Sequence, residues 1–464
     1  MEEKLTTESG NGGAEDRITK LPEPIIQCIF SFLETIDVIR SSAVSRSWRH
    51  LWTSIPHLSF TQSTVWTDSS TNRRFKDFVN WVLINRNPSV CIEKFRLTNY
   101  WFEEEGDRDG KNWFYRWVSL AARGNVKELD LSIYPDVPIS FPYSLVTCQS
   151  LVALKVELWM RVLHLPAVTS GFPSLKSLEL KRLTLNDENV ARNFIAGCHI
   201  LEHLSLNSCV FQGFKVLEIY SANLKCLNIS DTSYLEGTIL AGGLSGSKLE
   251  VDCPKLVSFT FSGPSALEYS FKNLLSIDKA SIVWTPAFEG QEIYNLVSQV
   301  LSGLRNAKVL ALYPLFFPTS VERLYPAKLE SLSFSRLKVL ELDSSHINWV
   351  KLLLKCAPNL EVLLLLILFP KEHQVEDETT LLEREDQNIE FECLRKSLKR
   401  IHLIFVRGYK VELELIRFLL KHGLALEEMT IIWKRDVESK YTSEAQEEIL
   451  QFQKASSSVS LSFL

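Results

Sequence analysis

Leucine and other large apolar residues recur along most of this chain in the spacing L-x-x-L-x-L. Twelve copies, five regular and seven looser, begin at Val126, Leu151, Leu175, Leu201, Leu224, Leu256, Ile277, Ala307, Leu337, Leu360, Leu398 and Leu426. In a β-strand alternate side chains share a face, so the fourth and sixth positions of each copy point to one side. The pattern therefore predicts a series of short strands, each with one buried face.

The spacing between copies is that of a repeat protein. The first five copies are separated by 25, 24, 26 and 23 residues, within the period of about 20 to 29 residues of leucine-rich repeats. Later gaps of 32 and 38 residues predict insertions. One unit cannot bury its own leucines, so neighbouring units must stack. We expect an α/β solenoid, a leucine-rich-repeat horseshoe with helical or irregular return segments on its convex side.

Residues 15–55 show a different spacing, with apolar positions three and four residues apart as on a helix. The apolar members of the first predicted helix are Ile25, Ile26, Ile29, Phe30 and Leu33. Pro22 suits the first turn of this helix, a second helix is predicted over residues 35–43, and a third follows Ser45, a favourable N-cap. Three helices in about 40 residues form a small core, which favours a partner surface.

This stretch resembles the F-box of plant proteins. The resemblance rests on the segments DRITKLP at 16–22, IFSFL at 29–33, DVIRSS at 37–42 and VSRSWRHLW at 44–52. One departure is Ile36, where the family often has Lys. The resemblance implies a module that docks a Skp-type adaptor, which in turn holds the cullin and RING subunits of a ubiquitin ligase.

The resemblance also implies which residues contact the adaptor. They are Leu21, Pro22, Ile25, Ile26, Ile29, Val44, Trp48, Leu51 and Trp52. The expected physics is recognition of helices by a groove, with a few apolar anchors supplying most of the binding energy. The alternative is that Trp48 and Trp52 belong only to the internal core of the module.

The C-terminal part continues the repeat and then closes it. It is predicted to contain a strand over Leu398–Phe405, a turn at Gly408, a helix over Val411–Lys421 that stops at Gly423, and a strand over Glu428–Trp433. It resembles the FBD domain of plant F-box proteins, which implies a plant source and a terminal cap of the kind that solenoids need. The expected organisation is a disordered tail at 1–14, an F-box at 15–62, an N-terminal cap or linker at 63–119, repeats at 120–390 and an FBD domain at 391–464.

The residues between the repeated leucines should face the concave surface. In the later strands these residues are more apolar than exposed positions usually are. The predicted substrate-binding residues are Val309, Val339, Glu341, Val362 and Leu364. The sequence leaves an alternative open, in which the insertion at 370–392 or an error in the register of the looser repeats buries them.

Composition and charge narrow the class of protein. The chain is 45% hydrophobic and 23% charged with a net charge of −5, which disfavours a nucleic-acid partner. The longest apolar run, Val362–Phe369, is too short to span a membrane, so we expect no membrane contact. Nine cysteines without a C-x-x-C pair or a secretory signal favour reduced thiols in the cytoplasm or the nucleus.

No motif of an enzyme or of a cofactor site occurs. The chain lacks G-x-S-x-G, Walker, G-x-G-x-x-G and H-E-x-x-H motifs, and the pair Cys198-His199 has no second pair at metal-ligand spacing. We expect no catalytic residue, no cofactor and no metal.

The favoured hypothesis is a non-catalytic, substrate-recognition subunit of a Skp/cullin/F-box ubiquitin ligase that captures a protein on its repeats. The alternatives are a repeat scaffold outside any ligase and a ligase subunit that is also a small-molecule receptor, in which a ligand bound on the horseshoe, for example an anionic one, helps to hold the target. The second alternative would need basic residues on the concave face, where the early repeats offer only scattered residues such as Lys155.

Overall fold

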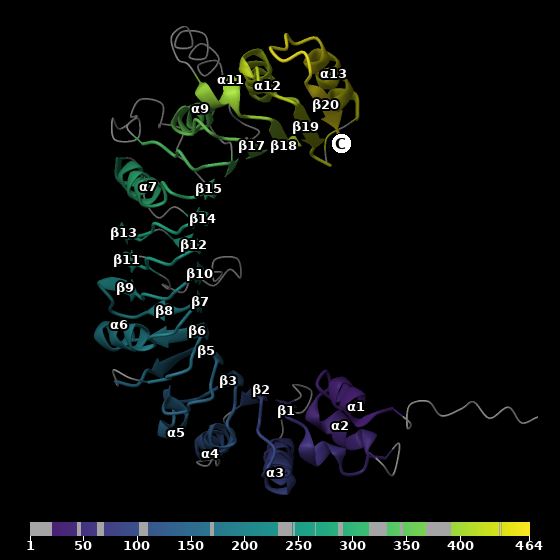
Figure 1. The fold of residues 1–464 in the computed structure, drawn as a ribbon, viewed down its shortest axis with the longest axis vertical. Helices are drawn as coiled ribbons and strands as arrows, with labels where there is room; N and C mark the ends of the chain where they lie inside the picture. Colours follow the sequence, from purple (N-terminus) through teal and green to yellow (C-terminus); the bar gives the residue numbers. More distant parts are fainter. Residues whose placement is uncertain are drawn as a thin grey trace, which may run out of the picture. The chain divides into compact units, whose positions relative to one another are not determined.

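In the computed structural model the chain forms two compact units (Figure 1). One unit comprises Met1–Asp136 and Pro142–Val156, and the other comprises Val137–Phe141 and Glu157–Leu464. The structure describes residues 21–43, 48–62, 69–101, 110–167, 171–230, 244, 246–264, 266–285, 291–314, 332–343, 347–367, 391–435, 437 and 439–464.

The first unit starts with small helices and continues into parallel strands. Its elements are α1 (Glu23–Phe30), α2 (Thr35–Ser41), the 3₁₀ helix η1 (Leu51–Ser54), β1 (His57–Thr61), α3 (Ser69–Asn85), β2 (Lys94–Trp101), α4 (Gly110–Arg123), β3 (Glu128–Tyr134) and α5 (Tyr143–Val146). Strand β2 pairs with β1 and β3, which brings Leu58, Phe95 and Leu129 into register. These side chains and Trp117 of α4 are at most 1% exposed and form the core of the unit.

Of the three helices predicted for the N-terminal module, two are present as α-helices. Pro22 is the N-cap of α1 rather than a residue of its first turn. Residues 44–47, where the third helix was predicted to begin, lie outside the described residues, as does the predicted tail at 1–14. Trp48 then lies in a turn, and η1 follows it.

Strands β1 and β2 carry the repeat pattern with aromatic residues at some leucine positions. The pattern is Ile55-x-x-Leu58-x-Phe60 for β1, and the corresponding residues of β2 are Ile92, Phe95 and Leu97. Repeat-type strands therefore begin before the first predicted copy at Val126, because a phenylalanine fills a leucine position in the stacked core equally well.

The second unit is built on a long parallel sheet. Its strands are β6 (Ser177–Leu185), β7 (His203–Asn207), β10 (Cys226–Ser230), β12 (Ser258–Pro264), β14 (Lys279–Thr285), β15 (Val309–Pro314), β16 (Val339–Asp343), β17 (Val362–Leu366), β18 (Arg400–Val406), β19 (Glu428–Trp433) and β20 (Ser460–Phe463). Strand β5 (Ala153–His164) begins in the first unit and ends in the second. Two short strands, β4 (Ile139–Ser140) and β8 (Val210–Phe211), pair with the ends of β5 and β6.

Every predicted repeat contains a strand that starts two residues after the first apolar residue of the copy. For example, the copy at Leu201 continues into β7 from His203. The strands stack in register, so that Leu204, Leu227 and Phe259 form one row, each at most 2% exposed. The repeat pattern thus determines both the location of the strands and the face that they bury.

Helices and a second sheet cover the buried side of the long sheet. The helices are α6 (Glu188–Gly197), α7 (Gln291–Gly303), α9 (Ile347–Cys356), α11 (Glu392–Lys396), α12 (Lys410–His422) and α13 (Ser439–Leu450). Between α6 and α7 the cover is a three-stranded parallel sheet of β9 (Val216–Tyr220), β11 (Lys248–Asp252) and β13 (Glu268–Lys272), visible beside β7, β10 and β12 in Figure 1.

This outer sheet departs from the helical or irregular return segments that the sequence predicts. Its strands bury every second residue, such as Leu217 and Ile219 of β9, whereas a helix would bury every third or fourth. The periodicity is present in the sequence, but each segment has only two or three inward apolar residues, too few to stand out beside the stronger pattern of the long sheet.

The C-terminal elements match their prediction closely. Strands β18 and β19 and helix α12 agree with the predicted bounds within about two residues. Gly408 adopts a φ of +85°, a conformation that favours glycine, in the predicted turn. The Glu412 carboxylate, which is fully buried, accepts backbone N–H bonds from Arg407, Gly408 and Tyr409 at 2.8, 2.7 and 3.0 Å and so closes this turn.

Candidate protein-docking surfaces

Helices α1 and α2 leave a strip of large apolar side chains exposed. This apolar strip consists of Ile25, Ile29, Phe32, Leu33 and Ile36, with exposed fractions of 48, 40, 84, 39 and 40%. The first three are spaced by four and three residues and therefore lie along one side of α1 and its final turn. Adjacent exposed apolar residues of this size are typical of a protein contact surface.

The opposite side of α1 belongs to the core of the module. Ile26 and Phe30 are 4 and 2% exposed, and the Phe30 ring meets the Trp48 ring edge to face with centroids 5.6 Å apart. Helix α1 therefore has two apolar faces, only one of which the chain itself covers.

The predicted adaptor-binding residues fall into several groups. Pro22, Ile25 and Ile29 are exposed, Leu21 and Leu51 are half-buried, Ile26, Trp48 and Trp52 are buried, and Val44 lies outside the described residues. The sequence prediction omitted Phe32, Leu33 and Ile36, although Phe32 continues the spacing of Ile25 and Ile29.

The helical module is anchored to the first strand of its unit. The Thr35 hydroxyl accepts a hydrogen bond from the Ser59 backbone N–H at 2.8 Å, and Glu34 accepts one from the Ser59 hydroxyl at 3.1 Å. Trp52 stacks on Trp81 of α3 with ring centroids 4.9 Å apart. These contacts hold the apolar strip on a fixed support, which lowers the entropic cost of binding a partner.

The predicted substrate-binding residues lie in two rows on the open face of the long sheet, the face opposite its helices. Val309, Val339 and Val362 are paired in register on β15, β16 and β17, and Glu341 is paired with Leu364 in the adjacent row. All five are half-buried. The strand pairing therefore brings together residues that are up to 55 positions apart in the chain, from 309 to 364.

The same open face is polar in the middle of the array. Asn207 of β7 accepts hydrogen bonds from Ser230 at 2.8 Å and from the Asn228 side chain at 3.1 Å. Asn228 also donates to Ser205 at 3.1 Å. These polar side chains satisfy one another, whereas the rows on β15 to β17 are mainly apolar.

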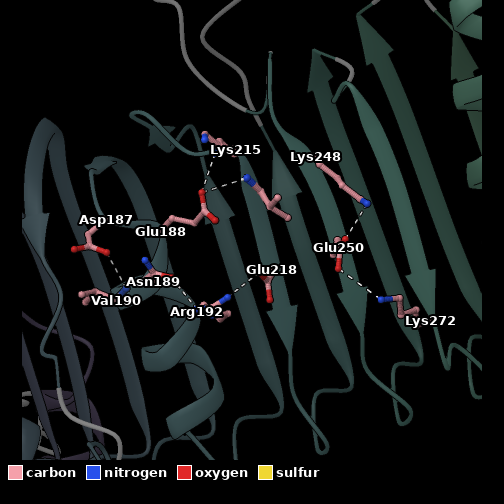
Figure 2. A network of polar contacts seen from close by, with 11 residues as sticks. Asp187, Glu188, Asn189, Val190, Arg192, Lys215, Glu218, Lys248, Glu250 and Lys272 are labelled. Carbon is pink, nitrogen blue, oxygen red and sulfur yellow. Dashed lines mark hydrogen bonds and ion pairs between the residues drawn. The ribbon is translucent and has the colours of Figure 1, made fainter.

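The outer sheet carries a network of ion pairs (Figure 2). Glu250 lies between Lys248, at 2.9 Å, and Lys272, at 3.7 Å. The hydrogen bond from Lys248 is the main reason why the pKa of the Glu250 carboxyl lies below its ordinary value. Arg192 of α6 pairs with Glu218 of β9 at 3.0 Å. This surface is a solvated face on which these charged side chains pair with one another.

Arrangements suited to chemistry are absent from the described part of the chain. It holds no cluster of three or more side chains able to bind a metal ion, and none of its helices is long and apolar enough to cross a membrane. A cavity of about 260 Å³ between the ends of β5 and β6 and the start of α6 contains Asp187, but this carboxylate already caps α6 by accepting the Val190 N–H at 3.0 Å. Among the described residues, the exposed apolar strip is therefore the feature most typical of a protein contact surface.

Protein-family models match three parts of the chain. The F-box domain model matches residues 18–59, and the FBD model matches residues 390–431. A model described as "FBD-associated F-box protein At5g56370, LRR repeats" matches residues 114–242.

Similar proteins from Arabidopsis thaliana have names that refer to the same types of domain. FBD-associated F-box protein At5g22730 is 25% identical over 439 residues, which cover 90% of this chain and 88% of that protein. F-box/FBD/LRR-repeat protein At1g51370 is 27% identical over 428 residues, which cover 90% and 89%. A further protein of the F-box/FBD/LRR-repeat type is 28% identical over 280 residues, which span 58% of this chain and only 53% of that relative.

Proposed function

Because this chain belongs to the plant F-box/FBD/leucine-rich-repeat proteins, we propose that it is the substrate-recognition subunit of a Skp/cullin/F-box ubiquitin ligase. F-box domains generally bind Skp-type adaptors, and these three domain types are typical of non-catalytic proteins. In this proposal the adaptor links the chain to the cullin and RING subunits. We expect the complex in the cytoplasm or the nucleus.

The apolar strip on α1 and α2 is the observation that carries the proposal. Its five apolar side chains are exposed to water in the isolated chain. Covering them with an adaptor groove would contribute about 25 cal/mol of binding free energy for each Å² of apolar surface removed from water. Phe32, the most exposed of them, is suited to be the central anchor, because buried aromatic anchors dominate many interfaces.

Ile26, Trp48 and Trp52 then act from behind this surface. Their burial fixes the orientation of α1 and η1, so that they shape the adaptor site without forming its outer layer. Pro22, Ile25 and Ile29 remain the predicted direct contacts among the residues that the sequence singled out.

The open face of the long sheet is the proposed site of substrate capture. A captured protein would be held near the ubiquitin-loaded enzyme that the RING subunit recruits. Ubiquitin transfer to the captured protein would be faster because the two reactants are held close together, so the chain itself needs no catalytic group.

Copurification with a Skp-type adaptor tests this function. We expect the full chain to bind the adaptor and the double substitution Ile29→Asp, Phe32→Asp to weaken binding by about a hundredfold or more, because two charges would enter an apolar contact. Leu275→Asp, at a residue of the second unit that is 68% exposed, is the matched control and should bind normally.

Thermal unfolding of the same proteins provides the folding control. Both altered residues of the double variant are exposed, so its melting temperature should remain close to that of the unaltered chain. Normal adaptor binding by the folded double variant would exclude the apolar strip as the docking site. Absence of adaptor binding by the unaltered chain would favour the scaffold hypothesis instead.

A further inference from the structure

Glu341 is a carboxylate in a mainly apolar part of the open face. On β16 it is paired in register with Ala311 of β15 and Leu364 of β17. The row on one side of it consists of Val309, Val339 and Val362. The row on the other side contains Leu366, Ile404 and a second, buried carboxylate, Asp343. The valines and Leu364 are half-buried, so their outer atoms remain within reach of a binding partner.

A neighbouring side chain orients this carboxylate. The Tyr313 hydroxyl donates a hydrogen bond to the Glu341 carboxylate. The pKa of Tyr313 lies above its ordinary value, mainly because the hydroxyl is buried and also because of this hydrogen bond. A carboxylate offers about four acceptor positions, so one phenol leaves most of its capacity for a ligand.

The basic residues of this face lie at some distance from Glu341 in the sheet. Among the residues of the described strands, Lys279 is two strands away on β14, and Arg400 and His402 are two strands away on β18. Two strand spacings correspond to about 10 Å. The register neighbours of Glu341 are apolar, which strengthens its attraction for a cation that enters the row.

We propose that this part of the open face binds an extended segment of the substrate protein that carries a lysine or arginine between apolar residues. The inference rests on the proposed function only in taking the captured molecule to be a protein. The valine and leucine rows bury the apolar residues of the segment, and Glu341 accepts a charge-assisted hydrogen bond from the basic one. The distance from β15 to β18 is about 14 Å, which about four or five extended residues cover.

Charge disfavours the chain's own acidic segment as the occupant. Residues 371–390 contain eight carboxylates and only two lysine or arginine residues. Like charges near Glu341 would repel, so the site is better suited to a separate, basic segment.

Peptide binding to the purified full chain tests the proposal without the adaptor. The probes are two libraries of nine-residue peptides with Leu, Val, Ile and Ser at varied flanking positions, one with a central Lys and one with a central Glu. We expect the Lys library to bind at least about tenfold more tightly, the usual scale of one charge-assisted contact. Glu341→Lys should reverse this preference.

A matched charge reversal controls for effects elsewhere on the sheet. Glu179 of β6 occupies the corresponding row of the open face, and Glu179→Lys should leave the preference for the Lys library unchanged. Val362→Ser should weaken binding of both libraries, because it removes apolar contact area without adding a charge.

Melting temperatures identify any variant that fails to fold.

Several results would overturn the proposal. Two of them are equal binding of both libraries and an unchanged preference for the Lys library in Glu341→Lys. The third is a tenfold rise in peptide binding when residues 371–390 are replaced by a short Gly/Ser linker, because that result would mean that this segment occupies the face. The double variant at Ile29 and Phe32 should bind peptides normally, so that failure of the peptide site and failure of the adaptor site give separate signals.

Discussion

Individual side chains show where this protein departs from a simple repeat. Tyr269 lies in the core between the long sheet and the outer sheet, and burial raises the pKa of its hydroxyl group above the ordinary value. Its oxygen accepts hydrogen bonds from the Trp284 indole N–H and the Ala266 backbone N–H, both at 3.1 Å. One phenol therefore satisfies two buried donors in a core that is otherwise mainly apolar.

Removal of this hydroxyl should destabilise the fold. We expect Tyr269→Phe to lower the free energy of unfolding by about 1–3 kcal/mol, because both buried donors lose their acceptor. Urea unfolding measured by tryptophan fluorescence checks this value. Tyr220→Phe, at a position 58% exposed, is the control, and equal midpoints for the two variants would contradict the assigned role of Tyr269.

The cysteines differ sharply in their surroundings. Burial raises the pKa of the Cys198, Cys253 and Cys393 thiols to about 12, whereas Cys28 and Cys91 are exposed. At pH 8 a thiol with a pKa near 12 is a thiolate in only about one molecule in 10⁴, and only the thiolate reacts.

Alkylation should follow this division. With iodoacetamide at pH 8, mass spectrometry of the folded chain should find Cys28 and Cys91 modified first. Cys198, Cys253 and Cys393 should be modified only after unfolding. Rapid modification of Cys253 in the folded chain would show that the core between the two sheets opens readily.

At the scale of elements, charged side chains connect many of the successive repeats just before the strand begins. Glu202 pairs with Lys225 at 2.7 Å, and Lys338 pairs with Glu361 at 2.6 Å. The hydrogen bond from Lys338 is the main reason why the pKa of Glu361 lies below its ordinary value of 4.5. In most copies the residue after the first apolar position thus has a role that the leucine pattern does not reveal, whereas Val152 and Val257 occupy this position in two copies.

These pairs predict the direction of acid destabilisation. A carboxyl group whose pKa is lower in the folded chain than in the unfolded chain stabilises the fold. This stabilisation is complete above the pKa of the unfolded chain and is lost as the pH falls through the pKa of the folded chain. Glu361→Gln should therefore lower the melting temperature slightly at pH 7, and the difference from the unaltered chain should shrink as the pH falls below 4.5 and Glu361 becomes protonated in the folded chain. A difference that does not shrink as the pH is lowered from 7 would have a cause other than the charge of Glu361.

At the scale of the whole molecule, the chain has two candidate docking surfaces, the apolar strip of the first unit and the open face of the second. Cys28 lies on α1 among the residues of the apolar strip and is exposed. It therefore provides a probe of adaptor docking that needs no substitution in the chain.

The adaptor should protect this cysteine. We expect alkylation of Cys28 to slow at least tenfold in the complex with a Skp-type adaptor, while Cys91, exposed outside the helical module, reacts at its former rate. The measurement is time-resolved alkylation with peptide mass spectrometry. Equal rates for Cys28 with and without a bound adaptor would mean that α1 is not the docking helix.

Much of the architecture follows from short-range information. The apolar spacing locates the strands of all twelve predicted repeats, because a strand alternates its faces every residue and only one register buries the leucines. Gly408 and the alternating apolar residues after Leu398 likewise suffice to predict the turn, the helix and the strands of the C-terminal part. The F-box segments identify the family before any contact is known.

Whether an individual apolar residue is buried or exposed depends on packing that no local sequence pattern encodes. Ile25 and Ile26 are neighbours with the same side chain, yet one is 48% exposed and the other 4%, because α1 turns only one face toward Trp48. The outer sheet forms since β9, β11 and β13 find partners in one another, although each is too short to be stable alone. Likewise, the row that joins Val309, Val339 and Val362 exists only when distant strands pair. Local spacing can specify a strand or a helix, but which surfaces stay open is settled by what the rest of the chain leaves uncovered.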